Sequence, residues 1–142
     1  MCVRKLLAGR APAPTIRPEA SVDDLIHHLA RHDAGAAVVS ADETSVDGLV
    51  SERDVVRALR DGGPALLRQP VSEIMTAKPP VVDAHDCYVS ALGLMLDRKL
   101  RHLPVVENGR YAGLVSIRDI AQRRMDEVLG EAEAMRHYID GA

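Results

Sequence analysis

Two copies of a Ser-x-Arg-Asp tetrapeptide carry the residues of this chain that are best suited to bind a small molecule. They are Ser51-Glu52-Arg53-Asp54 and Ser116-Ile117-Arg118-Asp119, and each follows a Gly-Leu-Val tripeptide. Serine followed three residues later by an acid is typical of a capping box, in which the two side chains satisfy free backbone groups at a helix start. Such a cap needs no ligand, so a purely structural role is one interpretation of both copies.

The same residue types also suit a nucleotide. A helix N-terminus presents free N–H groups and a partial positive charge, which favour phosphate. The serine hydroxyl adds a hydrogen bond and the arginine adds a charge. The aspartate has the wrong sign for phosphate but suits the paired hydroxyls of a ribose. One helical turn with these three side chains therefore fits a ribose phosphate, and capping and binding are compatible.

The tetrapeptides belong to an internal repeat. Residues 48–55 and 113–120 are identical at six of eight positions, and residues 3–10 match residues 71–78 in their apolar positions. Prolines follow each of the earlier pieces. A repeat of this kind indicates one structural unit used twice.

Each copy of the repeat must supply the elements that position its tetrapeptide. The hydrophobic spacing predicts a short lead strand, a helix, two antiparallel strands and a second helix that starts at the tetrapeptide. Ser21 and Asp24 predict the cap of the first long helix, and Asn108-Gly109 predicts a hairpin turn. One copy is too short to bury a core by itself, whereas two copies packed together are long enough.

The order and duplication of these motifs resemble a tandem pair of CBS (cystathionine-β-synthase) domains, from about Val3 to about Arg124. The second unit is the closer match, since Arg101-His102-Leu103-Pro104-Val105-Val106 is followed by a short turn and the tetrapeptide. The resemblance implies an α+β fold in which two βαββα units pack about a pseudo-twofold axis, with a C-terminal helical extension. We expect a first unit at residues 1–63, a linker at 64–70, a second unit at 71–124 and the C-terminal helix at 125–142.

The resemblance also implies a ligand and its contacts. Such pairs bind AMP, ADP or ATP between their units, with NAD(H) or S-adenosylmethionine ranked below these. The aspartates are expected to hold the ribose, the basic residues before the Leu-Pro-Val strand to face phosphate, and the lead strands to line the adenine. The expected ligand-binding residues are Asp119, Ser116, Arg118, Arg101, His102, Pro104, Ile16, Asp54, Ser51, Arg53 and Val82.

The two units differ in the residues before that strand. The first unit has Ala34-Gly35-Ala36-Ala37 where the second has Arg101-His102-Leu103-Pro104. We therefore expect the cleft that uses Asp119, Ser116 and Arg101 to be the better phosphate site. The cleft that uses Asp54 is then expected to be empty or to take an uncharged group.

Composition disfavours several other classes of partner. The net charge is −3, and the chain has no Phe and no Trp, which argues against nucleic-acid binding. No apolar run is long enough to span a membrane, and the N-terminus is too short for a secretory signal. Cys2 and Cys87 form no disulfide framework, so we expect a protein of the reducing cytoplasm.

Other reactive side chains do not form a convincing centre. His28 and His32 have a spacing that can hold a metal, but the sequence shows no further ligands to complete the site. Cys87 lacks a nearby base, and His102 lacks a nucleophile to activate. We expect no metal, no required cofactor and no catalysis, with an enzyme or metal-dependent redox protein using Cys87 or the histidines as a rival hypothesis.

The segment beyond the repeat has a heptad pattern, because Met125, Val128, Ala132, Met135 and Ile139 recur at steps of three and four. Such a helix either folds back on its own module or meets its twin or a client protein. We expect a stand-alone regulatory module that forms a homodimer. Its bound nucleotide favours one arrangement of the two units, and a separate client protein recognises that arrangement. The alternative is a structural or assembly protein whose tetrapeptides are only caps.

Overall fold

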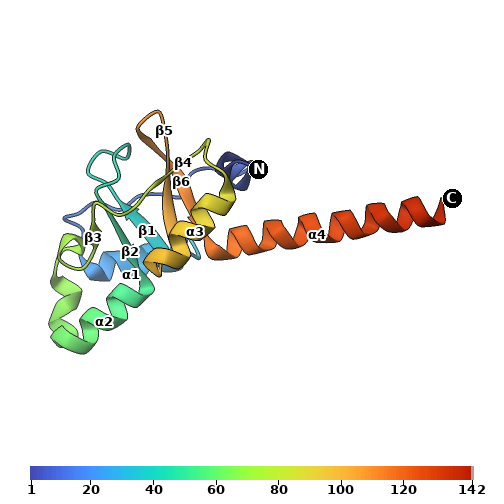
Figure 1. Ribbon diagram of the computed structural model, residues 1–142. Coiled ribbons are helices and arrows are strands. Elements are labelled where there is room, and N and C mark those ends of the chain that lie inside the picture. The colour runs from blue at the N-terminus through green and yellow to red at the C-terminus, as the bar shows by residue number, and fades with distance from the viewer. Residues whose placement is uncertain (142) are drawn as a thin grey trace.

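Two three-stranded sheets, one around the antiparallel strand pair of each repeat, form the centre of this computed structural model, which describes residues 1–141 (Figure 1). The first sheet has the order β1-β2-β3 and the second has the order β4-β5-β6. β4 pairs parallel with β5, and the other neighbours are antiparallel. The strand bounds are Ala36–Val39, Gly48–Ser51, Thr76–Ala77, Val82–Asp83, His102–Glu107 and Arg110–Ser116 for β1 to β6.

Four α-helices cover the sheets or extend from them. Their bounds are Val22–Arg31, Glu52–Gly62, Tyr88–Arg98 and Ile117–Asp140 for α1 to α4, and three 3₁₀ helices span Val3–Leu7, Gly63–Arg68 and Val71–Glu73. The predicted cap of α1 is confirmed, since Ser21 Oγ accepts from Asp24 N at 3.0 Å and Asp24 accepts from Ser21 N. In the first repeat the lead strand is reduced to one parallel bridge between Ile16 and Val39.

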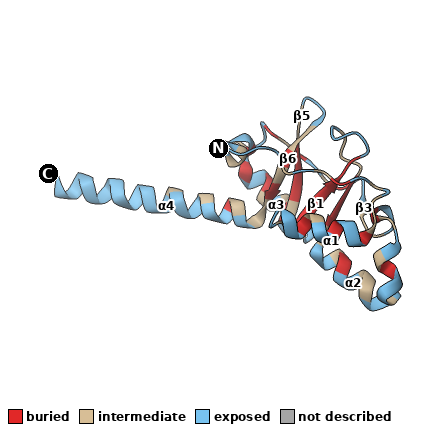
Figure 2. Cartoon of the chain, turned by 180° about the vertical axis from the view of Figure 1, so that it is seen from behind, coloured by how far each residue is buried: buried red, intermediate tan, exposed pale blue. Residues whose placement is uncertain are grey.

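Each repeat lends its first segment to the core of the other. Val3 is fully buried among residues of the second repeat, and Val71 is fully buried among residues of the first. The backbone follows the same exchange, because Val3 N donates to Asp86 O at 2.8 Å and Val71 N donates to Ala20 O at 2.7 Å. Figure 2 shows the buried residues concentrated on the strands and on the inner faces of the helices beside them. Neither core is therefore complete within one repeat.

Two glycines let the exchanged segments lie against the strands. A Cβ at Gly48 in β2 would collide with the Met75 side chain, whose Cγ would lie 3.0 Å away. A Cβ at Gly113 in β6 would lie 3.0 Å from the methyl groups of Leu7. Met75 and Leu7 occupy equivalent positions of the repeat, so the same close contact occurs in both units.

The predicted α+β fold of two units with a C-terminal helix is confirmed. α4 is one continuous helix from the second tetrapeptide to Asp140, and it projects away from the body instead of folding back (Figure 1). Ala142, the last residue of the predicted C-terminal helix, lies outside the described residues. Within residues 1–141, no helix is both long enough and apolar enough to cross a membrane.

Two Gly→Ala substitutions should change stability in opposite directions, because the added methyl contacts an exchanged segment at one glycine and contacts nothing at the other. Gly48→Ala should lower the free energy of unfolding by about 1–3 kcal/mol, because the added methyl forces apart β2 and the segment at Met75. Gly93→Ala lies in α3, where a Cβ meets nothing within 4 Å, and should raise stability by up to about 1 kcal/mol. Urea denaturation measures both. A Gly48→Ala variant as stable as wild type would contradict the close contact.

Candidate functional site

The two tetrapeptides lie at strand-to-helix junctions, where β2 enters α2 and β6 enters α4. Both form capping boxes. Asp54 Oδ2 accepts from Ser51 N at 2.8 Å, and Asp119 Oδ2 accepts from Ser116 N at 2.8 Å. The predicted helix caps are therefore confirmed for both copies. It also fixes each carboxylate at the first turn of a helix, on the surface between the two units.

The open cleft lies at the first tetrapeptide. It is a cavity of about 400 Å³, with Ser51, Arg53 and Asp54 on the wall formed by the first unit. Arg101 and His102 of the second unit form part of the opposite wall. We call this cavity the Asp54 cleft. Five of the predicted site residues thus lie together in it.

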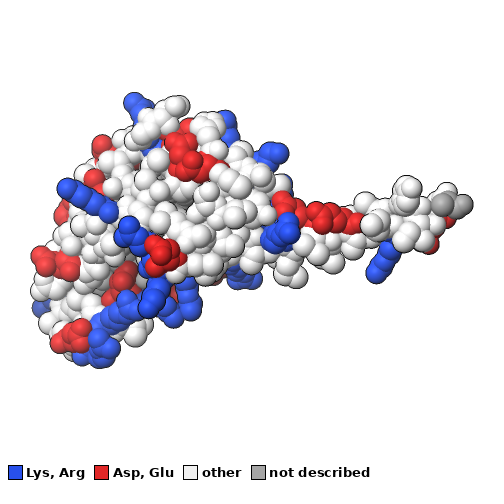
Figure 3. Space-filling model, in the orientation of Figure 1, with Lys and Arg blue, Asp and Glu red and all other residues white. Residues whose placement is uncertain are grey.

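The Asp54 cleft is rich in positive charge. Its lining includes two acidic residues and five cationic ones, the latter being Arg53, Arg57, Arg98, Lys99 and Arg101. Among these five cations, and within the described residues, only Arg98 has an acidic neighbour within 4.0 Å, which is Asp97 at 3.9 Å. Figure 3 shows Lys and Arg side chains gathered on the lower part of the body, with Asp and Glu side chains among them. The cleft therefore offers unneutralised cations to an anionic ligand.

Three of these cations were not expected from the sequence. Arg57 lies one helical turn after Arg53, so both project from the same face of α2. Arg98 and Lys99 come from the end of α3, where Lys99 adopts the left-handed conformation with φ 55° and ψ 41°. Glycine is the usual residue there, and a lysine in this conformation costs free energy. The nearness of Arg98 and Lys99 to Arg101 in the sequence was the available signal.

The basic pair of the second unit faces the tetrapeptide of the first unit. Arg101 and His102 are equivalent in the repeat to Ala34 and Gly35. Gly35 packs against His102, since a Cβ on Gly35 would lie 3.5 Å from His102 Cε1. The sequence led us to group Arg101 with Asp119, whereas the structure places Arg101 in the cavity that contains Asp54. Burial lowers the pKa of His102, although the nearby Asp119 carboxylate opposes this.

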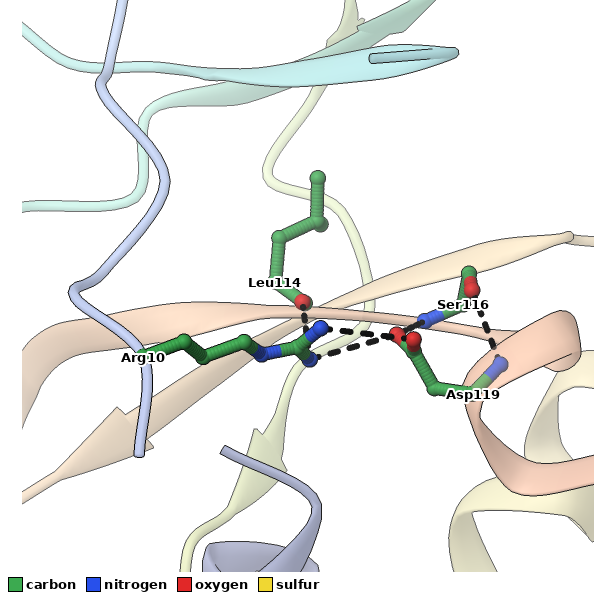
Figure 4. Close-up of polar contacts among 4 residues, drawn as sticks. All are labelled: Arg10, Leu114, Ser116 and Asp119. Atoms are coloured by element: carbon green, nitrogen blue, oxygen red, sulfur yellow. Dashed lines mark hydrogen bonds and ion pairs between the residues drawn. The ribbon is translucent and has the colours of Figure 1, made fainter. Parts of the chain in front are cut away.

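In the second tetrapeptide, the carboxylate of Asp119 forms an ion pair with another side chain of the same protein. The guanidinium of Arg10 donates to both carboxylate oxygens of Asp119, at 3.3 and 3.2 Å, and to the carbonyl oxygen of Leu114 at 3.4 Å (Figure 4). Burial raises the pKa of Asp119, but the hydrogen bonds from Arg10 and Ser116 outweigh it, so this pKa lies below its ordinary value. The cavity beside Arg10 measures only about 100 Å³. No sequence pattern linked these two residues.

The other predicted site residues lie away from the Asp54 cleft. Ile16 and Val82 are buried in the cores of the first and second units. Pro104 is buried in β5 opposite Leu114 of β6, and Arg118 is exposed on α4. None of these four side chains lines the 400 Å³ cavity.

The candidate metal and redox residues are dispersed. Within residues 1–141, no three His, Cys, Asp or Glu side chains lie close enough to hold a metal ion. The rings of His28 and His32 contact each other, with centroids 4.7 Å apart. Cys87 is an exposed free cysteine, and its backbone bridges that of Cys2.

Comparison with known proteins gives consistent results. The family model of the CBS domain matches residues 3–61 and again residues 71–126. A CBS-domain containing protein from Agrobacterium tumefaciens is 34% identical with a TM-score of 0.82, over 87% of this chain and 99% of that one. A CBS domain protein from Pyrobaculum aerophilum, solved in complex with AMP, is 30% identical with a TM-score of 0.75, over 84% and 89%.

Among curated proteins, an uncharacterized 17.7 kDa protein of Acidianus ambivalens is 31% identical over 112 residues, which cover 78% of this chain. The chain spans between 25% and 66% of the length of the first four curated relatives it matches. Whole-protein activities of such relatives therefore do not transfer directly to this chain.

Proposed function

Because the chain belongs to the CBS-domain family as a tandem pair of CBS domains, we propose that it is a regulatory module that binds an adenine nucleotide in the Asp54 cleft. The observation that carries the proposal is the grouping of Asp54 and Ser51 with unneutralised cations from both units in one open cavity. The AMP complex of the Pyrobaculum aerophilum relative supports the ligand class.

The cleft offers a matched contact for each polar part of a nucleotide. Asp54 uses Oδ2 for its cap, and within the described residues its other oxygen, Oδ1, accepts no hydrogen bond. That oxygen accepts a ribose hydroxyl, which is a hydrogen-bond donor. Arg53 and Arg101 then lie on opposite walls of the same cavity, where guanidinium groups bind phosphate oxygens in charge-assisted hydrogen bonds.

The number of cations favours a polyphosphate over AMP. Five cationic side chains face two acidic ones, Glu52 and Asp54, so the lining has an excess of positive charge beyond what a single phosphate neutralises. ATP and ADP therefore bind more tightly than AMP. S-adenosylmethionine, whose sulfonium is positively charged, is the least favoured of the adenosyl ligands.

The ligand regulates by contacting both units at once. A nucleotide held between Asp54 and Arg101 stabilises the arrangement of the two units that presents both residues to it. The module acts as a homodimer without catalysis of its own, and a separate client protein reads the bound arrangement. Its free cysteines, Cys2 and Cys87, fit the reducing cytoplasm.

Asp54→Ala should weaken ATP binding at least about tenfold, because a hydrogen bond to a charged group contributes about 1.5–3 kcal/mol. Isothermal titration calorimetry with ATP and AMP measures the loss. Asp24→Ala is the matched control, since it removes the equivalent capping acid from α1, outside the cleft. Asp119→Ala should retain most of the affinity. Equal losses for Asp54→Ala and Asp119→Ala would contradict the assignment to the Asp54 cleft.

The structural alternative, in which the tetrapeptides are only caps, makes a different prediction for the wild-type protein. A bound ligand raises the melting temperature by mass action. Absence of any shift with AMP, ADP and ATP at millimolar concentration would favour the structural role and overturn the proposal.

Lys99→Gly should reduce ATP affinity about five- to tenfold while reducing AMP affinity less, because it removes one cation from the lining of the cleft. Glycine adopts the left-handed conformation readily, so the fold should be retained. Lys78→Gly is the matched control, because Lys78 also has a positive φ of 47° but does not line the cavity. The ratio of the two dissociation constants measures the effect. An unchanged ratio in Lys99→Gly would contradict the preference for polyphosphate.

A further inference from the structure

The part of α4 beyond the repeat, from Met125 onward, carries a stripe of large apolar side chains in water. Met125, Val128, Met135 and Ile139 are 60%, 47%, 63% and 67% exposed. They repeat at the heptad spacing of a helix that packs on another helix. Figure 2 shows the outer part of this helix exposed along its length. An isolated helical segment of this kind is marginally stable in water, so the stripe needs a partner.

The inner half of α4 borders an open apolar groove. The groove has a volume of about 710 Å³ and lies between α3 and α4, with Val89 and Leu92 on the α3 side. Met125 and Val128 line the groove and also begin the exposed stripe. Groove and stripe are thus one continuous surface, about as long as α4 itself.

We propose that this surface binds α4 of a second copy of the chain, with the two helices antiparallel. The inference rests on the proposed homodimer and names its interface. In an antiparallel pair, the tip of each helix lies in the groove at the base of the other. One symmetric contact then covers both apolar surfaces of both copies.

The heptad residues complement themselves in this orientation. With the twofold axis beside Gly130, Ala121 lies opposite Ile139 of the second copy and Val128 lies opposite Ala132. Met125 lies opposite Met135. A small side chain thus faces a large one in the pair of residues 121 and 139 and in the pair of residues 128 and 132, while two methionines face each other in the third pair. Every heptad residue from Ala121 to Ile139 has an apolar partner.

Other arrangements use the surface less completely. A parallel pair places each alanine opposite its own copy and leaves both grooves without the partner's tip. Its compensating ion pairs between Glu131 and Arg136 would be exposed, and exposed pairs contribute little. An antiparallel pair shifted by one heptad toward the body places Arg118 against Met135 and leaves Ile139 without a partner in the stripe.

Two alanines two residues apart on α4 provide a matched test. Ala132→Glu places a charge in the stripe, whereas Ala134→Glu makes the same change on the opposite side of the helix. Light scattering after size exclusion at micromolar concentration should show a dimer for wild type and Ala134→Glu, and at least a tenfold weaker dimer for Ala132→Glu. Equal dimerisation of both variants would overturn the α4 interface.

Disulfide cross-linking tests the orientation, with Cys2→Ser and Cys87→Ser as background. A mixture of Ala121→Cys and Ile139→Cys chains should give a covalent heterodimer. Ile139→Cys alone should not cross-link, because the two copies of residue 139 lie about 27 Å apart along the antiparallel pair. Cross-linking of Ile139→Cys with itself would overturn the antiparallel arrangement.

The outcomes separate this inference from the proposed function. A monomeric wild-type protein would overturn both the homodimer and its interface, while ATP binding, measured by calorimetry on the same sample, stands or fails independently. A dimer that survives Ala132→Glu would keep the homodimer and overturn only the role of α4.

Discussion

The exchange of segments between the two repeats is the constraint on which the rest of the structure depends. Val3 and Val71 complete cores that belong to the opposite repeat, and Gly48 and Gly113 provide the room for the crossing chains. Because neither core closes alone, the two units are held as one body. The Asp54 cleft between them, where we propose that a nucleotide binds, is therefore built from both halves of the chain.

Two copies of one repeat give two different clefts. The guanidinium of Arg10 donates to both carboxylate oxygens of Asp119, so the negative charge at the second tetrapeptide is neutralised by the protein's own side chain. The first cleft keeps Asp54 accessible and adds cations from α2 and from the end of α3. Ala34 and Gly35, at the positions equivalent to Arg101 and His102, carry no charge. The difference between the clefts lies in a few side chains rather than in the fold.

The repeat, the helix caps and the position of the tetrapeptides could be predicted from the sequence, because each depends on residues close together in the chain. Ser51 and Asp54 act on each other across three residues, so their spacing is sufficient. The contact between Arg10 and Asp119 spans 109 residues and has no local signature. Alignment of the repeats also could not show that Arg101 faces the other unit, because that depends on how the units pack.

The central claim is that a nucleotide binds in the Asp54 cleft while Arg10 keeps the second cleft closed. A crystal structure of the protein grown with ATP tests this most directly. The account predicts the ribose at Asp54, the phosphates on cations from both walls, and an intact contact between Arg10 and Asp119. Nucleotide bound at Asp119, with Arg10 displaced and the Asp54 cleft empty, would contradict it.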